Sequence, residues 1–90
     1  MNASPQDKLR EIVATVLEID MTNVRGSMSR TQTKQWDSLN HLNICVAVGQ
    51  EFQVEISAEE MTRIQRVADL ARLLAARGVK IDPDFGEEAE

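Results

Sequence analysis

Residues 36–52 read WDSLNHLNICVAVGQEF, a short polar motif followed by an apolar pattern with helical spacing. Asp37 is a preferred N-cap residue, so the pattern predicts a helix from residue 38 to about residue 52. Ser38 then lies in the first helical turn, where its hydroxyl is exposed, fixed in position and close to the partial positive charge of the helix N-terminus. Such a hydroxyl is well placed to be joined to a phosphate group and to hold it.

The apolar residues of this helix do not fall on one narrow stripe. We expect the inward face to consist of Leu39, Leu42, Cys45, Val46, Gly49 and Phe52. Ile44, Ala47 and Val48 widen the apolar surface beyond that face. The helix therefore either packs centrally or presents an apolar flank to a partner.

Helix signals also occur on both sides of this segment. Ser4 followed by Pro5 predicts a helix start, and an apolar stripe continues from there to about residue 19. The sequence from Ser57 to Glu60 forms a capping box for a short helix. A last apolar stripe covers residues 67–75, and Gly78 is well placed to end it.

Residues 20–35 lack periodicity and predict a long loop, which Met21, Val24 and Met28 are expected to pin to the core. Aromatic residues make up only 3% of the chain, so the core must be built from aliphatic side chains. The sequence therefore predicts an all-α fold, a small bundle of three main helices and one short helix with a long first loop.

Ninety residues suffice for one small domain but not for a core plus a catalytic cleft. We assign residues 1–78 to the folded domain and residues 79–90 to an acidic, disordered tail, of which Val79 and Ile81 can still dock on the core. No apolar run is long enough to span a bilayer, and no signal region precedes the first helix. With Cys45 as the only cysteine, a cytoplasmic location is expected.

The net charge of −5 is concentrated at the C-terminal end of the chain. Residues 78–90 hold five acidic side chains against one lysine, whereas residues 20–36 have a net charge of +2. No basic face results from this distribution, so neither nucleic acid nor a membrane is expected as a partner. A monomer is the expected oligomeric state.

Ser38, His41 and Asp37 could be taken for a hydrolytic triad, but helical spacing crowds all three onto one surface. The chain also lacks a nucleophile elbow and an oxyanion loop, so no catalytic residue is predicted. His41 and Cys45 could supply two metal ligands, but a structural zinc site requires four, so no metal site is predicted. We expect Cys45 to be a small core residue and His41 to be half-exposed.

With these features the chain resembles the acyl carrier proteins, the phosphopantetheine-binding carriers of fatty-acid, polyketide and nonribosomal-peptide biosynthesis. The resemblance covers roughly residues 5–77 and rests on the motif Asp37-Ser38-Leu39 and on the order of the helices. The segment EFQVEIS at residues 51–57 is similar to the one that follows the family's second helix.

The resemblance implies that 4′-phosphopantetheine is attached to Ser38, with Asp37 and Leu39 as the flanking motif. A separate magnesium-dependent phosphopantetheinyl transferase would supply the group from coenzyme A and release adenosine 3′,5′-bisphosphate. The thiol of the arm would carry an acyl or aminoacyl group as a thioester. A loading ligase and a downstream acyltransferase or synthase would be the further partners.

Two departures from the family pattern point to a specialised, discrete carrier with a dedicated partner. Family members of fatty-acid synthesis have acidic residues after the serine, where this chain has Asn40 and Asn43. The loop before the serine is basic rather than acidic, so charge steering toward the usual synthases is weaker. The residues expected to contact partners are Trp36, Asn40, His41, Asn43 and Lys34. The alternative function is an unmodified helical adaptor that binds a protein through its second helix.

Overall fold

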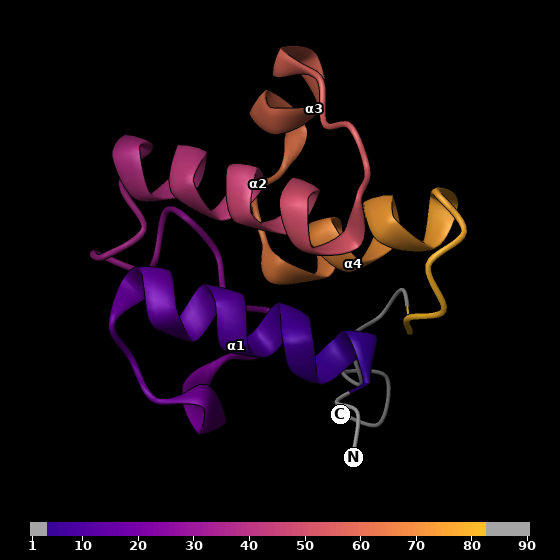
Figure 1. Cartoon of the computed structure of the whole chain (residues 1–90). Helices are drawn as coiled ribbons and strands as arrows, with labels where there is room; N and C mark the ends of the chain where they lie inside the picture. Colours follow the sequence, from indigo (N-terminus) through magenta and orange to yellow (C-terminus); the bar gives the residue numbers. More distant parts are fainter. Residues whose placement is uncertain (1–3, 83–90) are drawn as a thin grey trace.

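The computed structural model of the chain describes residues 4–82, in which the secondary structure is helical. The α-helices are α1 (Pro5–Leu17), α2 (Ser38–Phe52), α3 (Ala58–Arg63) and α4 (Val67–Ala76), and a short 3-10 helix η1 covers Met21–Asn23. The predicted all-α fold with three longer helices, one short helix and a long first loop is confirmed (Figure 1).

α1 and α2 pack side by side and run in opposite directions (Figure 1). An ion pair of 3.1 Å between Lys8 Nζ and Glu51 Oε2 joins the beginning of α1 to the end of α2. Leu9, Val13 and Leu17 form the buried stripe of α1. The helix ends at Leu17 rather than near residue 19, because Glu18 adopts a left-handed conformation with φ of 58°.

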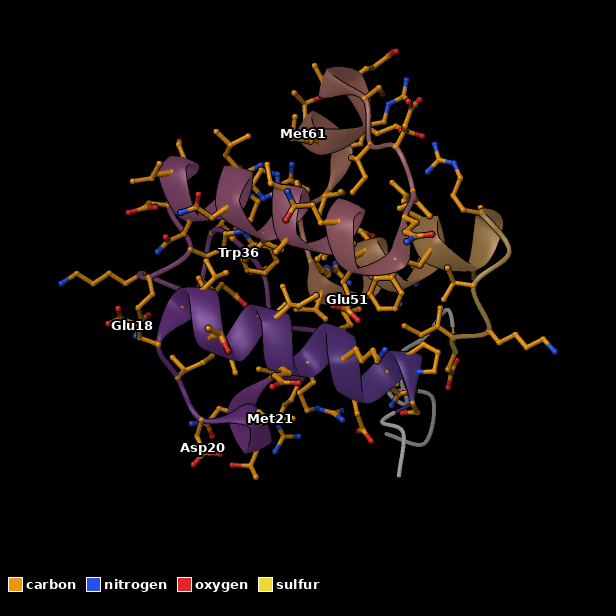
Figure 2. All side chains as sticks on the ribbon, in the orientation of Figure 1. Glu18, Asp20, Met21, Trp36, Glu51 and Met61 are labelled. Atoms are coloured by element: carbon orange, nitrogen blue, oxygen red, sulfur yellow. The ribbon has the colours of Figure 1, made fainter. Side chains whose placement is uncertain are left out.

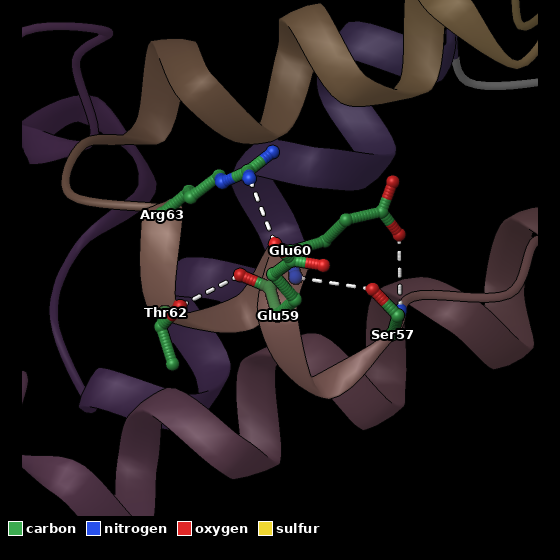
Figure 3. A network of polar contacts seen from close by, with 5 residues as sticks. All are labelled: Ser57, Glu59, Glu60, Thr62 and Arg63. Atoms are coloured by element: carbon green, nitrogen blue, oxygen red, sulfur yellow. Dashed lines mark hydrogen bonds and ion pairs between the residues drawn. The ribbon is translucent and has the colours of Figure 1, made fainter.

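The predicted caps of the helices are present. Ser4 Oγ accepts a hydrogen bond from the amide of Asp7 at 3.1 Å, and Pro5 is the first residue of α1. At α3 the Ser57 hydroxyl accepts from the amide of Glu60 at 3.1 Å, and the Glu60 carboxylate accepts from the amide of Ser57 at 3.0 Å (Figure 3). Gly78, with φ of 92°, follows the end of α4.

The long loop is held against the connection between α3 and α4. The amide of Arg30 donates to the carbonyl of Gln65 at 2.9 Å, and the amide of Val67 donates to the carbonyl of Met28 at 3.1 Å. These bonds satisfy backbone groups that would otherwise be left without partners in a loop of this length. Val24 is buried and Met28 packs against the core, as predicted, but Met21 is exposed, so the prediction that it pins the loop is wrong.

The core combines side chains from every α-helix except α3 with residues of the loops. Its buried members include Leu9, Val13, Leu17, Val24, Trp36, Ile44, Val48, Ile64, Val67, Leu70, Leu74 and Ile81. Val79 packs against this core and Ile81 belongs to it, so the predicted docking of both residues is confirmed. The rest of the predicted acidic tail, from residue 83 onward, lies outside the described residues.

Candidate functional site

Ser38 is the first residue of α2 and is exposed to solvent. The cap of this helix is Asp37, whose Oδ1 atom accepts a hydrogen bond from the amide of Asn40 at 2.9 Å. The carbonyl of Asp37 accepts from the amide of His41 at 2.8 Å. Asp37 thereby satisfies two of the amides at the start of the helix. The amides of Ser38 and Leu39 point out of the N-terminal end of α2, where an anion is favoured.

Three helices begin next to a serine, but the three hydroxyl groups are in different situations. Those of Ser4 and Ser57 cap their helices and are hydrogen-bonded to the amides of Asp7 and Glu60. Ser38 lies one residue beyond its cap, and no residue within 4–82 hydrogen-bonds to its hydroxyl. Among these serines, Ser38 therefore has the hydroxyl that is both accessible and uncommitted.

An exposed apolar stripe begins beside Ser38 and follows α2. The exposed fractions are 66% for Leu39, 47% for Leu42 and 49% for Val46, and the spacing of the three residues places them on one side of the helix. The prediction that these residues face inward is wrong. The buried face consists instead of His41, Ile44, Cys45 and Val48.

The error has a physical reason, since α2 is apolar on two sides. Ile44 and Val48, which in the sequence only widen the predicted inward face, are fully buried between the other helices. The alternative that the helix presents an apolar flank to a partner thus fits the structure. The exposed flank is the side with Leu39, Leu42 and Val46, which the sequence pattern assigns to the core.

His41 is buried, with 7% of its surface exposed, and connects two other parts of the chain. Its Nδ1 atom lies 3.0 Å from the indole Nε1 of Trp36, and its Nε2 atom lies 2.8 Å from the carbonyl oxygen of Met61 in α3. Figure 2 labels both Trp36, which lies against α2, and Met61. The prediction of a half-exposed His41 is wrong, because the ring fills the space between α2, α3 and the loop.

The hydrogen bonds and the burial of His41 limit what its side chain can do. Both ring nitrogens are engaged by Trp36 and Met61, so the imidazole is not directed at Ser38 as a general base would be. Burial also removes His41 and Trp36, which is 2% exposed, from the residues that can contact a partner through their side chains. The sequence predicts partner contacts for both side chains, whereas in the structure they hold the loop that leads to Ser38 against α2 and α3.

Asn40, Asn43 and Lys34 remain accessible around Ser38. The Asn40 side chain donates to the carbonyl of Gln35 at 2.8 Å, which ties the loop to the first turn of α2. Asn43 Nδ2 lies 3.5 Å from Asn40 Oδ1 on the same side of the helix. No acidic residue occurs in α2 before Glu51, so the surface that follows Ser38 along the helix is apolar and neutral. On its other side Ser38 is flanked by the exposed carboxylate of Asp37, and the loop before Asp37 is basic.

Cys45 is a buried free thiol, as predicted, and burial raises its pKa to about 11. Its Sγ atom lies 4.0 Å from His41 Nε2. Within residues 4–82 no group of three or more His, Cys, Asp or Glu side chains could hold a metal ion. In the same part of the chain no helix is long and apolar enough to cross a membrane.

Comparison with known proteins assigns this arrangement to a family. The chain is 31% identical over 75 residues to polyketide-8 synthase acyl carrier protein 2 of Streptomyces avermitilis. The aligned region covers 83% of this chain and 86% of the relative. The chain belongs to the acyl carrier protein family. The acyl carrier protein of Clostridium acetobutylicum is 29% identical over 70 residues, which is 78% of this chain and 91% of that protein. No family model matches the chain.

Membership of this family establishes the general role of the chain. Acyl carrier proteins are carriers rather than catalysts, so the chain is not an enzyme. As a class they carry 4′-phosphopantetheine and work together with biosynthetic enzymes and a phosphopantetheinyl transferase.

Proposed function

We propose that Ser38 is the attachment site of 4′-phosphopantetheine and that the chain carries an acyl or aminoacyl group as a thioester on this arm. The observation that carries the proposal is the uncommitted hydroxyl of Ser38, one residue beyond the Asp37 cap. Attack on a phosphorus atom requires a hydroxyl that is accessible and free of hydrogen bonds to the backbone. Ser4 and Ser57 do not meet this requirement.

The residues around Ser38 fit a phosphodiester. The amides of Ser38 and Leu39 lie at the positive end of the α2 dipole, which favours an anion. Asp37 keeps the first turn of the helix formed and holds Ser38 in a constant position. The bound group would supply a flexible arm with a terminal thiol, and the chain would supply the position of its attachment.

The exposed stripe of Leu39, Leu42 and Val46 supports a role in binding the partner enzymes. An apolar stripe that begins at the attachment residue places a bound enzyme within reach of the arm. Its neighbours Asn40 and Asn43 are neutral, so the exposed Asp37 at the start of the stripe and Lys34 in the loop leave this surface with little net charge. We therefore expect the loading ligase and the downstream acyltransferase or synthase to recognise this carrier mainly by apolar contact, in the cytoplasm.

An open pocket of about 320 Å³ between α2 and α3 offers a place for part of an apolar cargo. Most of its lining is apolar, and one amide side chain also contributes: the residues are Cys45, Val46, Gly49, Gln50, Val54, Ile56 and Met61. A short acyl chain has the size and polarity for the apolar part of such a site.

The proposal is tested by the intact mass of the protein after incubation with coenzyme A, magnesium and a broad-specificity phosphopantetheinyl transferase. We expect the mass to increase by one phosphopantetheine in the wild type and in Ser57→Ala, and to stay constant in Ser38→Ala. Modification of Ser38→Ala at the wild-type rate would refute the assignment. Ser57 is the matched control, because it is also an exposed serine at a helix start.

The exposed stripe on α2 also suits a second candidate function, that of an adaptor which binds a protein without being modified. In that case Ser38→Ala would retain the full function of the chain in its pathway, and Leu42→Asp would lose it. A carrier would lose its function in both variants.

A further inference from the structure

Three segments that are separate in the sequence meet at the side chain of His41. Trp36 belongs to the loop that leads into α2, His41 to α2 itself, and Met61 to α3. The hydrogen bonds of 3.0 Å to Trp36 and 2.8 Å to Met61 use both ring nitrogens. The two rings lie 6.0 Å apart between their centres and are tilted by 35°, so they also pack against each other.

The partners fix which nitrogen of His41 carries the proton. The indole Nε1 of Trp36 can only donate, so His41 Nδ1 must accept with a lone pair. The carbonyl of Met61 can only accept, so the proton of the neutral ring lies on Nε2. The site is therefore built for one tautomer of a neutral imidazole.

Protonation of the ring would affect the two hydrogen bonds differently. A proton on Nδ1 would face the indole N–H of Trp36, which places two donors against each other, and this bond would be lost. The bond from Nε2 to the Met61 carbonyl would persist and gain the strength of a charged donor. The indole of Trp36 is 2% exposed, so it could not replace the lost partner with solvent while it stays in place.

The other groups that face His41 do not compensate a positive charge. Arg30, from the long loop, repels the protonated ring. Cys45, one turn along α2, is a neutral thiol because its pKa is raised to about 11. The carbonyl of Met61 in α3 and the indole of Trp36 carry no charge. Burial lowers the pKa of His41 below its ordinary value, and the charge of Arg30 acts in the same direction, while the hydrogen bond to Met61 opposes them.

We propose that His41 is a pH-sensitive latch that holds Trp36, and with it the loop leading to Ser38, in place when neutral and releases them when protonated. The release is one-sided, because α3 stays bound to His41 in both states. Trp36 is two residues from Ser38, and its own amide donates to the carbonyl of Thr33 at 2.9 Å. Loss of the indole bond would thus loosen residues 33–37, including the cap of α2. The latch is independent of whether Ser38 is modified.

The test is a pH titration followed by NMR between about pH 8 and about pH 4.5, a range that brackets the ordinary histidine pKa. His41 and Trp36 are the only residues of their types, so the imidazole and indole signals are unambiguous. We expect the neutral ring to carry its proton on Nε2. The indole N–H signal should shift and lose its protection from solvent exchange at the same pH midpoint at which His41 titrates. The α3 amides should keep their protection at that midpoint.

Two variants make the test decisive. His41→Gln can accept from Trp36 and donate to Met61 without titrating, so its indole signal should not change with pH. Trp36→Phe keeps the packing of an aromatic ring but removes the donor, so the pKa of His41 should rise above the wild-type value. The proposal is overturned if the indole signal is unmoved when His41 titrates, if α3 is released together with Trp36, or if Trp36→Phe leaves the pKa of His41 unchanged. Global unfolding without an earlier change at the indole would overturn it as well.

Discussion

The carboxylate of Asp37 and the amide of Asn40 are joined by a hydrogen bond of 2.9 Å that spans Ser38 without involving its hydroxyl. At the other two serine-flanked helix starts the serine itself makes the corresponding bond. Because the cap of α2 lies one residue before the serine, the Ser38 hydroxyl takes no part in capping the helix. The hydroxyl of Ser38 is thereby available for modification while the helix start remains stabilised.

This separation predicts different stabilities for two serine variants. Ser38→Ala should change the free energy of unfolding by no more than about 0.5 kcal/mol, as for other surface substitutions. Ser57→Ala removes a cap and should lower it by about 0.5–2 kcal/mol. Urea denaturation monitored by circular dichroism measures both. A Ser38→Ala variant that is less stable than Ser57→Ala would show that Ser38 stabilises the helix start.

Substitutions at Asp37 separate its role as a cap from its charge. Asp37→Ala should lower the free energy of unfolding by about 1 kcal/mol, whereas Asp37→Asn should retain most of the stability, since asparagine is an equally good cap. If the negative charge matters to the transferase, Asp37→Asn will be modified more slowly than the wild type despite its intact fold. Equal rates would limit Asp37 to the capping role.

The two apolar sides of α2 should respond differently to truncation. Ile44 is fully buried, so Ile44→Ala should lower the free energy of unfolding by about 2–5 kcal/mol. Leu42 is 47% exposed, and Leu42→Ala should lower it by less than about 1 kcal/mol. Leu42→Ala should nevertheless slow modification by the transferase, measured as the initial rate. A large loss of stability in Leu42→Ala would contradict the orientation of α2.

The free energy of unfolding should become smaller as the pH falls below about 6.5, the ordinary pKa of histidine. Because the pKa of His41 is lowered in the folded state, chiefly by burial, the unfolded state binds more protons in this range. The stabilisation is complete above the unfolded pKa and is lost as the pH falls through the folded pKa. Urea midpoints measured over this range should show the decrease in the wild type and not in His41→Gln.

Carboxylates contribute separately, at lower pH. The backbone hydrogen bond from Ser57 is the main reason for the lowered pKa of Glu60. Its contribution should appear in the acidic range in wild type and His41→Gln alike. A decrease near neutral pH that persists in His41→Gln would exclude His41 as its source.

Several helix boundaries could be predicted from local chemistry, although the end of α1 at Leu17 could not. Asp37, Ser57 and Gly78 act through their immediate neighbours in the sequence, and the structure places each at the predicted end of a helix. Ser38 could be proposed as the attachment site for the same reason, since it directly follows the cap residue Asp37 in the sequence.

The burial of α2 could not be predicted in this way. Leu42 and Ile44 are equally apolar, and only the packing of α2 against the rest of the chain decides that Ile44 is inside. The role of His41 depends on Met61, which lies 20 positions further along the chain and supplies a backbone carbonyl rather than a recognisable side chain. The bonds between residues 26–30 and 65–68 are likewise made by backbone groups, which leave no pattern in the sequence.

The central claim, that Ser38 receives the phosphopantetheine arm, is tested most directly by locating the modification in the protein itself. Cleavage after Lys34 and Arg63 yields one peptide, residues 35–63, that contains both Ser38 and Ser57. Fragmentation of this peptide from the modified protein should place the added phosphopantetheine on Ser38. An added group on Ser57, or a peptide of unchanged mass in a protein that has gained the group elsewhere, would contradict the account.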